Sequence, residues 1–270
     1  MNSVQLLRGQ LRPALMGLLM TMACVTSVRA DEGIALTSIE QVPEGVEVPG
    51  KQVAAYTWDD LQGKNLLVLA EQVSEREDDG TQSAFVYAAQ YLLKGDRPKR
   101  VWMLHDDVQH CEFDASLRFD QAATKVTDLL RDGNTQVTVG YSRTCTSDVS
   151  PNEFKLIMRV GKSGKYRLRG LDRVGASWWD EDAGALRGMP LPTDCSVEAQ
   201  QKLVSQYKEQ GTELPLPGCY GDEKDFAKAP AGYLTFMRGH WFALMQRQDA
   251  DWSQSLAQPQ EPAEEAELAP

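Results

Sequence analysis

The fold class follows first from one stretch of sequence, Gln136-Val137-Thr138-Val139-Gly140-Tyr141-Ser142. Its apolar residues alternate with small or polar ones, so Val137, Val139 and Tyr141 share one face of a strand. The next run alternates in the same way, and its apolar face consists of Phe154, Leu156, Met158 and Val160. We therefore expect each strand to bury one face on a core and to leave the other face in water.

Further segments show the same period of two, with β-branched or aromatic residues. They are Val53–Trp58, Asn65–Gln72, Ser83–Leu93, Arg100–Leu104, Ala115–Phe119 and Lys165–Leu171. Short turns such as Asp79-Gly80 and the stretch 161–164 separate these segments and suit antiparallel neighbours. We expect a mainly β (α+β) protein, an antiparallel β meander with one or two C-terminal helices packed on it.

Helical spacing is found only late in the chain. Ser196–Gln210 is typical of a helix with Ser196 as its N-cap. A second helix is predicted from Pro230 to Met245, where apolar residues recur at i, i+4 and i+8 and Pro230 suits the first turn. From Asp249 onward the composition of Gln, Pro, Glu and Ala predicts a disordered acidic tail, so residues 31–248 should form a single domain.

The first thirty residues have the organisation of a secretory signal. Arg8 and Arg12 precede an apolar stretch at 14–25, and Val28-Arg29-Ala30 offers a cleavage site. The apolar stretch is shorter than the roughly 20 residues that a membrane-spanning helix needs. We expect cleavage after residue 30 and an exported protein, periplasmic or secreted, with no transmembrane segment after cleavage.

Cysteine usage fits an oxidising compartment. Cleavage would remove Cys24; lipidation of that residue is the alternative, weakened because no Leu-like residue stands three positions before it. The later cysteines are Cys111, Cys145, Cys195 and Cys219. Of the pairings open to four cysteines we favour the sequence-local one, 111 with 145 and 195 with 219. The chain has no CxxC motif or close His/Cys cluster, so we expect no metal and no other cofactor.

The charge balance bears on partners. The formal net charge is −11 at pH 7, and loss of the signal, which carries three arginines and no acid, makes it −14. Because nucleic-acid binding needs a basic surface, we expect no nucleic-acid partner. Within this acidic chain the stretch 155–173 has a local net charge of +6.

That basic stretch contains the candidate ligand-binding residues. In the strand Lys165–Leu171, the side chains of Lys165, Arg167 and Arg169 share one face. A basic ladder of this kind can recognise an anionic glycan or an acidic envelope protein. Nearby, Trp178-Trp179-Asp180 joins aromatic surface to a carboxylate, as a sugar site does. The alternatives are a solvated face whose charges pair with neighbouring acids, and core tryptophans followed by a polar loop.

Signals for catalysis or metal binding are weak. The segment His105-Asp106-Asp107-Val108-Gln109-His110 lacks an accompanying nucleophile motif and reads as a polar strand end. His240 reads as a packing or capping residue. The turn Asp128–Gln136 is similar to calcium-binding loops, but Leu130 and Gln136 replace two expected acids, which favours a plain hairpin turn. Catalytic residues stay unknown.

A resemblance supports the envelope context. The motif His105-Asp106-Asp107-Val108-Gln109-His110-Cys111, the turn at Asp132-Gly133, and the segments 144–151 and 155–158 are similar to an uncharacterised family of exported bacterial proteins. Some members are labelled as surface polysaccharide biosynthesis proteins, and the similarity runs from about Tyr56 to Trp241. It implies no known reaction.

The residues and the resemblance together lead us to expect an exported, envelope-associated binding or accessory protein, non-catalytic, acting on surface polysaccharide or on an envelope partner. The alternative is an enzyme acting on surface polysaccharide. That alternative predicts a cleft whose acids are drawn from Asp106, Asp107, Asp180, Glu181 and Asp182.

Overall fold

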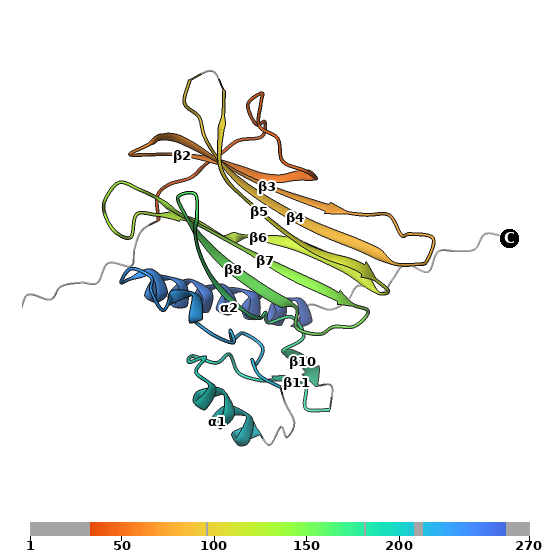
Figure 1. The fold of residues 1–270 in the computed structure, drawn as a ribbon. Helices are drawn as coiled ribbons and strands as arrows, with labels where there is room; N and C mark the ends of the chain where they lie inside the picture. Colours follow the sequence, from red (N-terminus) through yellow and green to blue (C-terminus); the bar gives the residue numbers. More distant parts are fainter. Residues whose placement is uncertain (1–32, 96, 181, 208–212, 258–270) are drawn as a thin grey trace, which may run out of the picture. The chain divides into compact units, whose positions relative to one another are not determined.

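The computed structural model describes residues 33–95, 97–180, 182–207 and 213–257. These residues form two antiparallel sheets, a small hairpin and two α-helices (Figure 1). The predicted fold class, a mainly β meander with C-terminal helices packed on it, is confirmed. The predicted signal at 1–30, including Cys24, lies outside the described residues.

The strands follow one another in space as they do in sequence. Sheet A consists of β1 (Thr37–Ser38), β2 (Lys51–Asp60), β3 (Gly63–Val73), β4 (Gln82–Leu92) and β5 (Lys99–Cys111). Sheet B consists of β6 (Asp114–Thr127), β7 (Gln136–Thr146), β8 (Glu153–Val160) and β9 (Gly164–Leu171). A separate hairpin pairs β10 (Ser177–Asp180) with β11 (Ala185–Gly188), and sequence patterning did not predict it.

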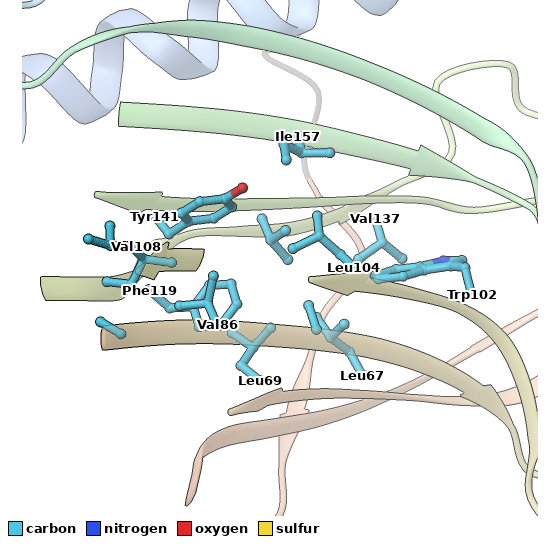
Figure 2. Close-up of a cluster of buried hydrophobic side chains, with 14 of the residues drawn as sticks. Leu67, Leu69, Val86, Trp102, Leu104, Val108, Phe119, Val137, Tyr141 and Ile157 are labelled. Atoms are coloured by element: carbon cyan, nitrogen blue, oxygen red, sulfur yellow. The ribbon is translucent and has the colours of Figure 1, made fainter. Parts of the chain in front are cut away.

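The main core lies between the two sheets. Figure 2 shows Leu67, Leu69 and Val86 of sheet A directed toward Val137 and Tyr141 of sheet B, and all of them are buried. Burial of each large apolar side chain contributes about 2 kcal/mol, more than an exposed ion pair does. The predicted apolar face of the 136–142 stretch is therefore the inner face of sheet B, the face turned toward sheet A.

The outer face of sheet B is also covered. This corrects the expectation that the Thr138 side of β7 would be wet, whereas the face of β8 that carries Phe154 and Leu156 is buried as predicted. Helix α2 (Tyr233–Ala257) packs on this outer face (Figure 1). The contact is made by Phe154, Leu156, Met158 and Leu168 of the sheet with Tyr233, Met237, Trp241, Leu244 and Met245 of the helix. On this outer face, position 140 has room only for glycine, because a Cβ there would lie 2.6 Å from the Cβ of Ala123.

The predicted start of the first helix is confirmed and its predicted end, 208–210, lies outside the described residues, whereas the second helix differs from prediction at both ends. Helix α1 (Val197–Tyr207) has Ser196 as its N-cap, since the Oγ of Ser196 accepts a hydrogen bond from the N–H of Ala199 at 3.2 Å. Helix α2 begins three residues after Pro230 and continues to Ala257, so the predicted disordered tail is wrong for residues 249–257. The remainder of that tail, 258–270, lies outside the described residues.

Tertiary contacts explain the extra turns of α2. Arg173, which is 1% exposed, donates to the carboxylate of Asp249 at 2.7 Å and to the carbonyls of Pro217 and Met189. The indole of Trp252 donates to the carbonyl of Ser177 at 2.7 Å. Arg173 therefore joins the end of α2 to two loops. The sequence periodicity of the helix alone could not predict these contacts.

The favoured cysteine pairing is confirmed. Cys111–Cys145 joins the ends of β5 and β7, and Cys195–Cys219 holds the segment after α1 against the chain that precedes it. This second disulfide fixes Tyr220 beside β9, where it forms a bridge with Gly170. Two disulfides are consistent with an oxidising compartment. Among the helices of the described residues, none has the length and apolarity needed to cross a bilayer.

The buried guanidinium of Arg173 provides the first test. Arg173→Met keeps much of the side-chain volume but leaves Asp249 and two carbonyls without their donor, so we expect the free energy of unfolding to fall by about 3 kcal/mol. The matched control, Arg187→Met, removes an exposed ion pair with Asp180 and should cost less than about 1 kcal/mol. Urea unfolding measures both, and equal losses would contradict this role of Arg173.

Candidate functional site

The predicted basic ladder lies on the inner face of sheet B. Arg167 is paired in register with Ile157 and Arg169 with Lys155, and Ile157 belongs to the core between the sheets. Sheet A ends at β5, however, so the inward side chains of β9 lie beyond its cover, and Lys165 and Arg169 are exposed. We call the inward cations of β8 and β9 the basic face: Lys155, Arg159, Lys165, Arg167 and Arg169.

Part of the basic face is neutralised by acids. Lys155 lies 2.5 Å from the carboxylate of Asp106 on β5, and the guanidinium of Arg169 lies 3.2 Å from Glu153. The hydroxyl of Tyr141 also donates to Asp106, at 2.7 Å. Burial raises the pKa of Asp106, but the hydrogen bonds from Lys155 and Tyr141 outweigh it and hold the pKa below its usual value. At this end of the basic face the charges pair with neighbouring acids, which agrees with the alternative interpretation of a solvated, paired face.

The other end of the basic face is not neutralised. Arg167 pairs with Asp225 at 2.9 Å, but within the described ranges neither Arg159 nor Lys165 forms an ion pair. The Nε of Arg159 is buried and has no hydrogen-bond partner there. Burial, followed by repulsion from Arg167 and Arg159, lowers the pKa of Lys165. Positive charge therefore accumulates around Arg159 and Lys165, which we call the unpaired end.

A buried aromatic ring adjoins the unpaired end. The guanidinium of Arg159 lies over the ring of Trp102 on β5, 5.3 Å from its centroid. The indole of Trp102 donates to the side chain of Gln90 at 2.6 Å, which fixes the ring in place. This contact holds Arg159 at the margin between the two sheets. Sequence reasoning counted Arg159 within the basic stretch 155–173 but missed its contact with Trp102, because only the packing of the sheets brings β5 beside β8.

The structure does not bring the predicted aromatic segment to the basic face. Trp178 and Asp180 belong to β10, which packs on the C-terminal part of α2 and so lies on the outer side of sheet B. Trp178 is 54% exposed, and Asp180 pairs with Arg187 at 3.3 Å. The side chain of Trp179 lies outside the described part. Trp178 and Asp180 are thus separated from Lys165, Arg167 and Arg169 by the sheet.

The acids proposed for catalysis are scattered. Asp106 and Asp107 are adjacent on β5 and point to opposite faces, since Asp106 meets Lys155 whereas Asp107 lies beside His105. Asp180 and Asp182 belong to the distant hairpin, and Glu181 lies outside the described residues. The low pKa of Asp106 suits an ion pair rather than a proton donor. These positions support no shared catalytic cleft.

The histidines have structural roles in this arrangement. The ring of His105 stacks on Tyr87 with centroids 4.9 Å apart. His240 is buried, its Nε2 lies 3.0 Å from the carbonyl of Ala123, and burial lowers its pKa. The packing interpretation of His240 is therefore supported.

Two loops carry groups that could bind a cation. In the predicted hairpin turn, Asp128 accepts hydrogen bonds from the N–H groups of Asp132 and Gly133, which supports a self-closed turn. Elsewhere Glu77, Asp79 and His110 each bring one ligand atom within 4.8 Å of the others, a cluster that sequence analysis missed. All three side chains are exposed to water, so we assign no metal to them.

The Asp106 network generates a prediction about pH. A carboxyl group whose pKa is lower in the folded than in the unfolded state stabilises the fold above its unfolded pKa of about 3.9, and this contribution is lost as pH falls through the folded pKa. Asp106→Asn should cost about 2 kcal/mol at pH 7 and clearly less at pH 3. The control Asp107→Asn should cost less than about 0.5 kcal/mol at both pH values. Urea unfolding at the two pH values measures this, and a loss in Asp106→Asn that does not change with pH would contradict it.

Comparisons with known proteins identify no relative of this chain: no family model, no curated protein and no solved structure matches it. The resemblance drawn from residues such as Asp106 and Cys111 therefore stays a prediction. The strongest functional observation is the chain's own geometry, in which uncompensated positive charge gathers at Arg159 and Lys165 on an acidic protein.

Proposed function

We propose that this protein is a non-catalytic, exported envelope protein that binds an anionic polymer, such as an acidic surface polysaccharide, through its basic face. The observation that carries the proposal is the unpaired end. Arg159 and Lys165 form no ion pair among the described residues, although the chain as a whole has far more acids than bases. An anionic ligand would supply the missing charge.

The position of the basic face supports binding of an extended ligand. The inward side chains of β9 alternate along the strand, so Lys165, Arg167 and Arg169 are spaced at about 7 Å from one to the next. Sheet A does not cover them, and the disulfide-held segment at Tyr220 lies along the edge of β9. A polymer with repeated negative charges could contact several of these cations at once, and each contact would weaken as salt rises.

The ion-paired state of the acids at the basic face supports binding rather than catalysis. Asp106 and Glu153, two of the carboxylates that contact the basic face, are held in ion pairs with Lys155, Arg143 and Arg169, as Asp225 is with Arg167. Neither is presented as a free acid or base beside the unpaired end. The basic face thus offers charge recognition and rigidity, and the described carboxylates that contact it are held in ion pairs rather than free for glycoside cleavage.

Charge reversal tests the proposed surface. The triple variant Lys165→Glu, Arg167→Glu, Arg169→Glu should lose retention on immobilised polygalacturonate, with binding at least about tenfold weaker, equivalent to about 1.4 kcal/mol. The control triple variant, Lys51→Glu, Lys64→Glu, Lys99→Glu, makes the same change in net charge on sheet A. It should retain at least half of the binding. Equal loss in both variants, or no loss in the first, would reject the basic face as the site.

Single neutral variants test the role of the unpaired end. Lys165→Gln should weaken binding about fivefold, because Lys165 is free to meet the ligand. Arg169→Gln should weaken it less than about twofold, because Arg169 is already bound to Glu153. Affinities from calorimetry at low and moderate salt measure the difference, with urea midpoints confirming that both variants fold. A larger effect from Arg169→Gln would show that pairing does not decide which cations bind.

A further inference from the structure

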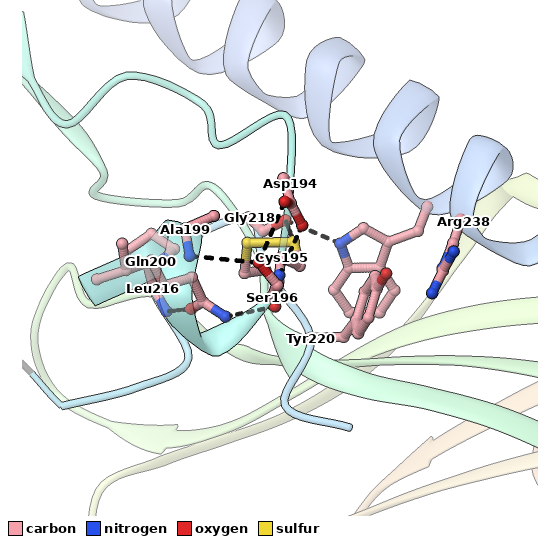
Figure 3. Close-up of a disulfide and its surroundings, with 12 residues drawn as sticks. Asp194, Cys195, Ser196, Ala199, Gln200, Leu216, Gly218, Tyr220 and Arg238 are labelled. Carbon is pink, nitrogen blue, oxygen red and sulfur yellow. Dashed lines mark hydrogen bonds between the residues drawn. A yellow bond between two sulfur atoms is a disulfide. The ribbon is translucent and has the colours of Figure 1, made fainter. Parts of the chain in front are cut away.

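A cavity of about 450 Å³ lies beside the Cys195–Cys219 disulfide. Three parts of the chain surround it: the loop before α1, the segment after Gly218, and one side of α2. Figure 3 shows Asp194, Tyr220 and Arg238 around this disulfide. The lining residues used below are Asp194, Tyr220, Asp222, Glu223, Arg238, Trp241 and Phe242.

The walls of the cavity are held in place by covalent and buried contacts. The disulfide links the loop before α1 to the segment that carries Tyr220. The indole of Trp241 donates to the carbonyl of Gly218 at 2.8 Å, and the rings of Tyr220 and Trp241 meet edge to face at 5.6 Å. Gln200, which is 2% exposed, bonds both Cys195 and Leu216. A preformed site of this kind loses little entropy when a ligand binds.

The polar groups of the cavity are both donors and acceptors. Glu223 forms a bidentate ion pair with Arg238, with both N–O distances 2.6 Å, and accepts a hydrogen bond from the hydroxyl of Tyr220 at 2.8 Å. The hydrogen bonds from Arg238, followed by that from Tyr220, outweigh burial and lower the pKa of Glu223, so it stays ionised. Asp222 is paired with Lys224 at 3.0 Å. Asp194 accepts from the N–H and hydroxyl of Ser196 and forms no ion pair among the described residues, so the lining is slightly negative, which favours a neutral ligand over an anion.

We propose that this cavity binds one neutral sugar ring. Sugar hydroxyls donate to carboxylates such as Asp194 and Glu223 and accept from a guanidinium such as Arg238. Partly buried Phe242, together with the cavity-lining rings of Tyr220 and Trp241, supplies an apolar wall for the C–H face of the sugar. The volume lies within the range of small-molecule sites. The carboxylates disfavour an anion, and the ion pairs disfavour a purely apolar ligand.

This site is independent of the proposed polymer-binding function, although the two surfaces are neighbours. Asp222 lines the cavity and also a small one, of about 40 Å³, formed with Arg167, Arg169, Lys224 and Asp225. A heteropolysaccharide that carries both neutral and acidic units could therefore occupy both surfaces at once.

The test uses the exported chain with its disulfides intact and five methyl glycosides as probes: those of glucose, galactose, mannose, N-acetylglucosamine and rhamnose. Each is titrated at millimolar concentrations while amide and indole NMR signals are followed. At least one glycoside should give saturable shifts that include the Trp241 indole and the amides of Gly221 and Arg238. Shifts from none of the five, or saturable shifts only outside the cavity, would overturn the proposal.

Variants locate the binding. Glu223→Gln and Phe242→Ala should each raise the Kd of the bound glycoside about fivefold, because they remove a hydrogen-bond acceptor and the apolar wall. The remote control Glu77→Gln should leave the Kd unchanged. The basic-face triple variant should also leave it unchanged, which separates this site from the polymer-binding surface. Unaltered affinity in both cavity variants, with their unfolding midpoints preserved, would reject the site.

Discussion

Burial of sheet B on both faces is the constraint on which the rest of the structure depends. Its inner face packs on sheet A and its outer face on α2, so apolar side chains are needed on both sides of β7 and β8. Phe154 and Ile157 illustrate this, since they occupy different faces of the same strand and are both buried. A sheet packed on both sides needs the helix to extend along it, which is why α2 is long and why Arg173 ties down its end.

The same constraint explains where charge gathers. Sheet A covers β6 and β7, but it ends at β5, so the inner face changes from apolar residues to cations at β8 and β9. At this margin Lys155 meets Asp106 and Arg159 packs on Trp102, while Lys165 remains without an acid among the described residues. The proposed ligand surface is thus the part of the sandwich that the second sheet does not close.

Local patterns predicted the strands, the meander, the N-cap at Ser196 and the alternation of Lys165, Arg167 and Arg169, because each depends on neighbours in sequence. Patterns could not predict partners that only packing brings together. The face of β7 expected to be wet is covered by α2, the end of α2 is set by Arg173, and Trp178 lies on the far side of the sheet from the basic face. The cavity at Cys195–Cys219 likewise needs three distant segments.

In the proposed function, anionic polymer binds where the basic face lacks acids. The most direct measurement is the change in backbone amide NMR signals when polygalacturonate is added at low salt to the chain with both disulfides formed. We predict the largest changes at Arg159 and along β9 around Lys165, and smaller ones at the paired Lys155. Changes centred on the β10–β11 hairpin or on the outer face of sheet A, or no changes at all, would contradict it.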